Sequence, residues 1–179
     1  MKKSIVFLMV FGAILTLGGC MSTNLHPDYV SLGRYDMMEV RANTPVALIN
    51  LQQPGMSTIK MGQTDMETDL SLWSAQAVAS IGNWLKTYDV HLSPEAVVKL
   101  KVSIVEPSFN MARHLPCARL SLKIQTESGI TKLYPVEGCA ATNNRAIGYA
   151  ISYAVMDMIR DREITDYIDK RYVRVEEKD

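Results

Sequence analysis

Three cysteines, Cys20, Cys117 and Cys139, are the residues of this 179-residue chain with the widest choice of chemistry. A cysteine can act as a nucleophile, a metal ligand, one half of a disulfide or an acceptor of lipid. No two of the three form a Cys-x-x-Cys pair, so the spacing of redox-active dithiols is absent. Each cysteine therefore has to be assigned from the sequence around it.

Cys20 stands at the end of a segment that is typical of an export signal. Two lysines give a positive start, and an almost unbroken apolar run of 13 residues follows from Ile5 to Leu17. A membrane-spanning helix needs about 20 apolar residues, whereas the apolar core of a signal peptide is of this shorter length. We expect residues 1–19 to be a signal peptide that takes no part in the fold.

The signal ends in Leu17-Gly18-Gly19-Cys20, which resembles the lipobox of bacterial lipoproteins. The resemblance implies that the chain is cleaved before Cys20. It also implies that diacylglycerol and a further acyl chain, such as palmitate, are attached to that cysteine. Two or three acyl chains would make the attachment to the membrane effectively permanent. Met21 follows where aspartate would resemble the inner-membrane retention signal, so we expect the outer membrane, facing the periplasm. An uncleaved anchor with a chance cysteine is the alternative.

Cys117 and Cys139 remain, and an even pair of cysteines in an exported chain predicts a disulfide. Between them, Glu127-Ser128-Gly129 is typical of a three-residue hairpin turn with its glycine at the position that needs a positive φ. A hairpin centred on Ser128 sets Cys117 directly opposite Cys139. Opposed Cα atoms lie about 4.5–5.5 Å apart, within disulfide range. Pro135 places the second strand at an edge or a bulge.

Metal binding has weaker support. His114 lies near Met111 and Cys117, and three further methionines recur at a spacing of five. These are Met56, Met61 and Met66. Thioether, imidazole and thiolate suit Cu(I), but methionine is also an ordinary filler of cores, and a spacing of five does not align side chains on one helix face. We expect no metal site.

Catalysis has no motif to rest on. The histidines His26, His91 and His114 occur in neither a His-Glu-x-x-His nor a Gly-x-Ser-x-Gly context, and no glycine loop suited to phosphate appears. The acidic run at residues 65–69 is explained by a solvated loop before the positive end of a helix. We therefore predict a protein that is not an enzyme, with no catalytic residue and no cofactor.

Composition limits the partners. Without residues 1–19 the chain has 17 basic and 19 acidic residues, a net charge of −2, and no basic stripe. Nothing here favours nucleic acid. The 160 residues fit one domain, which we place at 45–179 behind a polar, lipidated tether at 20–44. The oligomeric state is left open.

The pattern of apolar residues predicts the elements that position the cysteines. Strands are expected at 45–51, 97–106, 119–126 and 130–136. A polar stretch through Asp69 follows the first strand. Pro107 is expected to end the second strand, and a loop is expected at 108–116. Spacings of three and four predict a helix over 70–88, in which Trp73 and Trp84 are expected in the core. A last helix is expected after a cap at Asn143 or Asn144, running on or restarting through Ile168.

This order, β-α-β-β-β-α, predicts a two-layer α+β sandwich with a mainly antiparallel sheet and two helices on one face. Over residues 45–165, the order, the Tyr88-Asp89-Val90 step and the closing helix resemble small envelope lipoproteins of the YajG type. They are also similar to the auxiliary lipoproteins of lipid-handling ABC transporters.

The first resemblance implies a non-catalytic structural or partner-binding module, tethered through Cys20 and bound to another envelope protein. The second implies an auxiliary subunit of a lipid or solute transporter, with an apolar pocket between helices and sheet.

Overall fold

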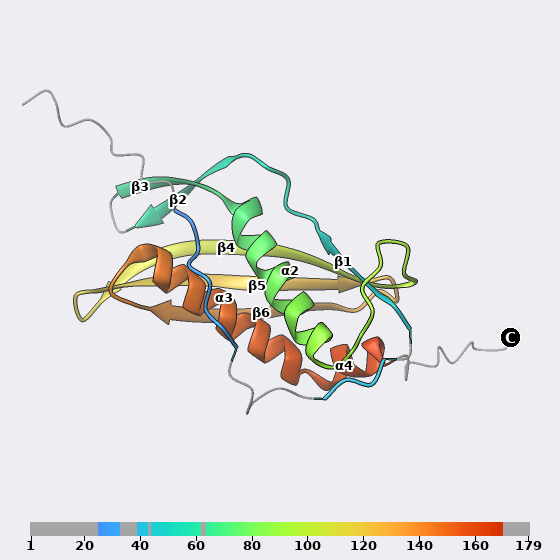
Figure 1. The fold of residues 1–179 in the computed structure, drawn as a ribbon. Helices are drawn as coiled ribbons and strands as arrows, with labels where there is room; N and C mark the ends of the chain where they lie inside the picture. Colours follow the sequence, from blue (N-terminus) through green and yellow to red (C-terminus); the bar gives the residue numbers. More distant parts are fainter. Residues whose placement is uncertain (1–24, 33–38, 43, 62–63, 170–179) are drawn as a thin grey trace, which may run out of the picture.

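The computed structural model describes residues 25–32, 39–42, 44–61 and 64–169, and within them six strands and three helices follow one another (Figure 1). In chain order they are β1 (Val46–Asn50), β2 (Met56–Met61), β3 (Thr64–Asp69), α2 (Leu70–Thr87), β4 (Val98–Ala112), β5 (Leu115–Thr126), β6 (Thr131–Cys139), α3 (Asn143–Arg160) and α4 (Arg162–Ile168). The predicted signal peptide and Cys20 lie outside the described residues. No helix within those residues is long and apolar enough to cross a membrane.

The strands form one sheet, and α2 and α3 cover one of its faces (Figure 1). Three of its strand pairs, β2–β3, β4–β5 and β5–β6, are antiparallel. The predicted two-layer α+β sandwich with a mainly antiparallel sheet is therefore confirmed. Trp73 and Trp84 are fully buried beneath α2, as expected, and the Trp73 ring meets Phe109 edge-on at 6.2 Å.

The strand order is β3-β2-β4-β5-β6, and β1 pairs with β4 off this path. β1 runs parallel to the first part of β4, from Val46 opposite Val98 to Asn50 opposite Val102. β2 joins the same side of β4 further along, where Met61 lies opposite Phe109. Two short strands thus share one side of the longest strand.

The register of the β5–β6 hairpin is the predicted one. Cys117 lies opposite Cys139, and Gly129 in the turn has a φ of 91°. β6 is an edge strand, so one of its sides faces no other strand. An edge strand can accommodate Pro135 because an N–H that is missing on the open side leaves no ladder hydrogen bond unmade.

The expectation that Pro107 ends β4 is wrong. The pairing with β5 shifts by one residue between Val105 and Ser108, and Glu106 has a φ of 53°. A β-bulge accommodates the proline, because the extra residue of a bulge is not paired in the ladder of hydrogen bonds. The bulge also changes which residues face inward: even-numbered side chains up to Ile104 are buried, and then Phe109 is.

The expected loop at 108–116 is also wrong, because β4 and β5 continue almost to their tight turn. Ala112 lies opposite Leu115, so only Arg113 and His114 connect the strands. Both have a positive φ, 48° and 67°, which is the signature of a type I′ turn. Such turns favour Asn-Gly, so the sequence gives no warning of this one.

The polar stretch before the first helix contains the β2–β3 hairpin, which no alternating apolar pattern predicts. Its residues are mostly polar, and only Ile59 and Met66, which pair with each other, give it an apolar rung. Asp65 and Glu67 are exposed on β3, so they belong to a strand rather than to a solvated loop.

Each helix begins at a side-chain cap. Asp69 accepts a hydrogen bond from the Ser71 N–H at the start of α2. Thr142, and not Asn143 or Asn144, caps α3. Asp161 caps α4, so the last helical pattern restarts after a break rather than running on.

Candidate functional site

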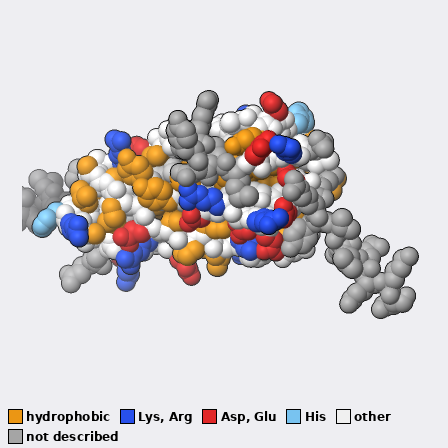
Figure 2. Space-filling model, turned by 90° about the horizontal axis from the view of Figure 1, so that it is seen from below, with side chains coloured by type: hydrophobic (Ala, Val, Ile, Leu, Met, Phe, Trp, Pro, Cys, Tyr) orange, Lys and Arg blue, Asp and Glu red, His pale blue; other side chains and the backbone are white. Residues whose placement is uncertain are grey.

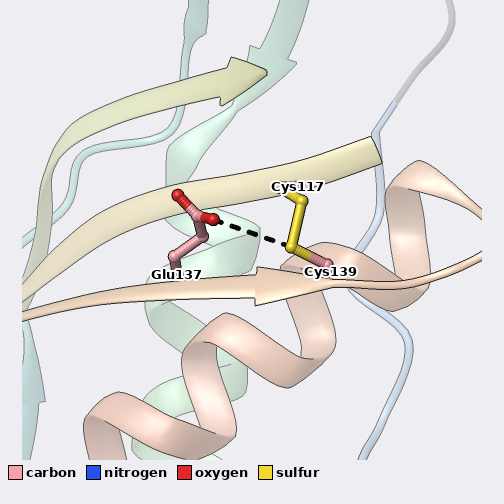
Figure 3. A group of neighbouring side chains, drawn as sticks. All are labelled: Cys117, Glu137 and Cys139. Carbon is pink, nitrogen blue, oxygen red and sulfur yellow. Dashed lines mark hydrogen bonds between the residues drawn. A yellow bond between two sulfur atoms is a disulfide. The ribbon is translucent and has the colours of Figure 1, made fainter. Parts of the chain in front are cut away.

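The disulfide between Cys117 and Cys139 joins β5 to β6 at the open end of the hairpin (Figure 3). The two Cα atoms are 4.0 Å apart, and 22 residues separate the cysteines in sequence. Cys117 is fully buried, whereas Cys139 is exposed. The predicted pairing and register are confirmed.

Glu137 is the acidic neighbour of this disulfide. Its Oε1 lies 3.7 Å from the Sγ atom of Cys139 (Figure 3), a contact rather than a hydrogen bond because a disulfide sulfur carries no proton. Its other oxygen pairs with Arg119 on the opposing strand. Cys117, Glu137 and Cys139 are near enough to hold a metal ion, but the joined cysteines offer no thiolate. The geometry is that of a structural cross-link.

Among the described residues, no histidine lies close enough to the two cysteines to share a metal with them. Within the described residues, the group of Cys117, Glu137 and Cys139 is the one cluster of histidine, cysteine or carboxylate ligands close enough for a metal. Met66 is buried and Met61 packs against the core, as expected of gap-filling methionines.

A second polar cluster ties β6 to the break between α3 and α4. The Tyr134 hydroxyl donates to Asp161 Oδ2 at 3.0 Å, and Lys132 Nζ lies 3.4 Å from the same oxygen and 2.5 Å from Glu163 Oε2. Burial, together with the Asp161 carboxylate, raises the pKa of Tyr134. The hydrogen bond with Glu163, helped by Asp161, raises the pKa of Lys132. Both shifts keep the Tyr134 hydroxyl and the Lys132 ammonium protonated, so both side chains continue to bond to Asp161. We therefore regard this cluster as structural.

The N-terminal segment at 25–32 packs on the domain instead of acting as a free tether. Leu25 is 3% exposed, and its carbonyl accepts hydrogen bonds from Thr68 Oγ1 and Trp73 Nε1. The segment then crosses α3, where Ser152 Oγ donates to the Val30 carbonyl (Figure 1, blue). The predicted tether, 20–44, is thus part of the fold from Leu25 to residue 32.

Gly148 permits this crossing. A Cβ atom at that position would lie 2.1 Å from the Asp28 carbonyl oxygen, which is closer than atoms approach. The Asp28 N–H also donates to the Asn144 carbonyl at 3.1 Å. The segment therefore lies on the helix backbone itself, a contact that hydrophobic periodicity does not reveal.

An open groove of about 420 Å³ lies between β1 and α2. Its lining is mostly apolar and comes from both elements and from the segment after α2. The apolar residues include Val46, Leu48, Val78, Ala79, Gly82 and Leu92. Asn83, Lys86 and Ser93 supply polar atoms. No local sequence pattern predicts this groove, because it depends on the placement of β1 beside β4.

The backbone of β1 is open along this groove. Leu51 donates its N–H to Val102 on β4, while Val46 bonds with His91 and Ser93 on the opposite side. Backbone groups alternate sides along a strand, so Leu48 directs its N–H and C=O into the groove. Among the described residues, none is hydrogen-bonded to those two groups. The groove therefore combines apolar side-chain positions with an unpaired strand edge.

The exposed Tyr153 and the partly buried Tyr149 form an aromatic pair on α3. Tyr149 and Tyr153 stack at 6.0 Å between ring centroids, and the Arg145 guanidinium lies 5.7 Å from the Tyr149 ring centroid. These three residues are spaced four apart on one helix, so their side chains contact one another on the same helix face. The groove is the stronger candidate because its backbone groups are still without a described partner.

No protein-family model matches the chain, and no curated protein does. Among solved structures, protein XCC0632 from Xanthomonas campestris, described as a DUF330 protein, matches with a TM-score of 0.54 and 11% sequence identity. The match covers 83% of this chain and 99% of that one. At this identity the likeness establishes a shared fold and no more.

Proposed function

We propose that this chain is a membrane-anchored envelope lipoprotein whose domain is non-catalytic and binds another protein at the β1–α2 groove. The observation that carries the binding proposal is the outward-facing backbone of Leu48 beside an apolar groove. An extended segment of a partner would add a strand to β1 through main-chain hydrogen bonds, and its alternate side chains would enter the groove. The occupant we infer is thus an extended, alternately apolar peptide.

The anchoring part of the proposal is supported by the lipobox at Leu17-Gly18-Gly19-Cys20 and by the disulfide, since such bonds persist in oxidising compartments. The test is Cys20→Ser expressed in bacteria with labelled palmitate. We expect loss of the label and retention of the uncleaved precursor. A variant processed like the wild type would overturn the anchoring proposal.

Groove binding is tested by affinity purification after crosslinking, with Ala79→Arg in the lipidated protein. Ala79 is exposed and lines the groove, so an arginine there blocks it without disturbing the core. Ala75→Arg, also exposed and one turn earlier on α2, is the matched control. We expect the crosslinked partner to be lost from Ala79→Arg alone. Equal capture by both variants would reject the groove as the binding site.

Strand addition is tested separately from side-chain packing by comparing Leu48→Ala with Leu48→Pro. Both remove most of the leucine side chain, but only proline removes the N–H that faces the groove. We expect Leu48→Pro to weaken partner capture beyond Leu48→Ala, with both proteins folded by circular dichroism. Equal capture would show that the groove recognises side chains only. Recovery of phospholipid instead of protein would favour the transporter-subunit alternative.

A further inference from the structure

The β4–β5 turn carries exposed apolar side chains on both faces of its hairpin. Met111 is 59% exposed and Leu115 is 43% exposed. Met111 pairs with Pro116, and Leu115 pairs with Ala112 in the adjacent rung. Because the side chains of adjacent rungs point to opposite faces, Met111 and Leu115 project from opposite faces of the hairpin. On the face seen in Figure 2, hydrophobic side chains gather in the half nearer this turn.

The backbone conformation of this turn is strained for the residues that form it. Arg113 and His114 both adopt a positive φ, where Asn-Gly would fit with less strain. Its tip therefore keeps a cationic side chain and an imidazole between two apolar ones. This combination suits a lipid surface, where apolar side chains enter the acyl region and basic ones stay at the headgroups.

The N-terminus enters the domain at the same end. Phe109, four residues before the turn, contacts Trp73, and Trp73 donates a hydrogen bond to the Leu25 carbonyl. Leu25 is five residues after Cys20, so the Cα atom of Cys20 can be at most about 18 Å from that of Leu25. From Phe109 the hairpin extends about 13 Å further to its turn. The anchor and the turn are therefore within reach of one membrane surface.

We propose that the β4–β5 turn rests on the membrane, with Met111 and Leu115 inserted among phospholipid acyl chains. This inference depends on the lipid anchor of the proposed function, but not on the groove. The β2–β3 hairpin, whose exposed Asp65 and Glu67 are repelled by anionic headgroups, stays outside the lipid.

The test uses the mature lipidated protein in vesicles of phosphatidylethanolamine and phosphatidylglycerol, with and without bromine on the acyl chains. Leu115→Trp reports the turn, and Ser128→Trp reports the exposed turn at the other end of the sheet. Native Trp73 and Trp84 are buried and give the background seen in the wild type. We expect brominated lipid to quench the Leu115→Trp emission and to leave that of Ser128→Trp unchanged.

A second measurement needs no reporter. Hydrogen exchange at residues 111–116 should slow when the lipidated protein is on vesicles, and Met111→Ser with Leu115→Ser should remove that protection. Val97→Ser with Leu133→Ser, two exposed apolar positions elsewhere, is the matched control and should retain it.

The outcomes separate this inference from the anchoring proposal. A mature protein without acyl chains by mass spectrometry, which fails to float with vesicles, would refute the anchor. A lipidated protein that floats with vesicles, but whose Leu115→Trp emission is no more quenched than that of Ser128→Trp, would refute membrane contact by the turn alone.

Discussion

Loss of the Cys117–Cys139 disulfide should destabilise the domain by an amount that its loop length determines. The bond closes a loop of 22 residues. In the chain-entropy model, a loop of about 22 residues costs the unfolded chain about 11 cal/mol/K, or about 3 kcal/mol at 25 °C. Because β5 and β6 are paired along their length, the folded hairpin keeps its register without the bond. The effect is therefore expected in the unfolded state.

The assay is urea unfolding followed by circular dichroism, comparing oxidised wild type, reduced wild type and Cys117→Ala with Cys139→Ser. Alanine suits the buried position and serine the exposed one. We expect the reduced protein and the variant to agree and both to be less stable than the oxidised protein by about 3 kcal/mol. The m-value should rise, because an unfolded chain without the cross-link exposes more surface.

Two results would contradict this reasoning. Oxidised and reduced proteins that unfold within about 1 kcal/mol of each other would show that the loop is already restricted when unfolded. A reduced protein that no longer unfolds cooperatively would show that the bond, rather than strand pairing, holds β6 in place.

Three further predictions test other parts of the structure. Gly148→Ala should release the N-terminal segment from α3, because its Cβ would overlap the Asp28 carbonyl; faster proteolysis after residue 28, with α3 intact, is the measurement. Asp69→Asn should lower the melting temperature at neutral pH, and the difference from the wild type should shrink as the pH falls below 3.8. The Ser71 hydrogen bonds lower the pKa of Asp69 below its ordinary 3.8, so its stabilisation is present above that value and is lost as pH falls through the lowered pKa. Density fractionation should place the mature protein with outer-membrane markers, since Met21 and not aspartate follows Cys20; an inner-membrane peak would contradict the retention rule.

The sequence predicts those parts of this fold that are set by local patterns. The alternation on either side of Gly129 fixes the β5–β6 register, and with it the position of Cys117 opposite Cys139. The recurrence of apolar residues from Leu70 to Leu85 similarly predicts α2. In both cases the signal lies within about 20 residues, and burial of one face decides the outcome.

The missed features depend on interactions that a local pattern does not contain. Pro107 normally ends a strand, yet the pairing of β4 with β5 on both sides of it favours a bulge over termination. The groove exists because β1 pairs with β4, about 50 residues later in the chain, so no short window predicts it. The packing of Leu25 under Trp73 is likewise a long-range contact of a segment that is polar and irregular in sequence.

The two proposed surfaces lie at opposite ends of β4. The β1–α2 groove begins where Val46 pairs with Val98, and the β4–β5 turn follows Ala112. Fourteen residue steps at about 3.3 Å separate these ends by about 45 Å. The segment from Leu25 to residue 32 is bonded to Trp73 and to Ser152, so the first described residue, Leu25, joins the domain near the turn. With the turn on the lipid, as we propose, the groove would lie away from the membrane, where an extended segment of a periplasmic partner can reach the open edge at Leu48.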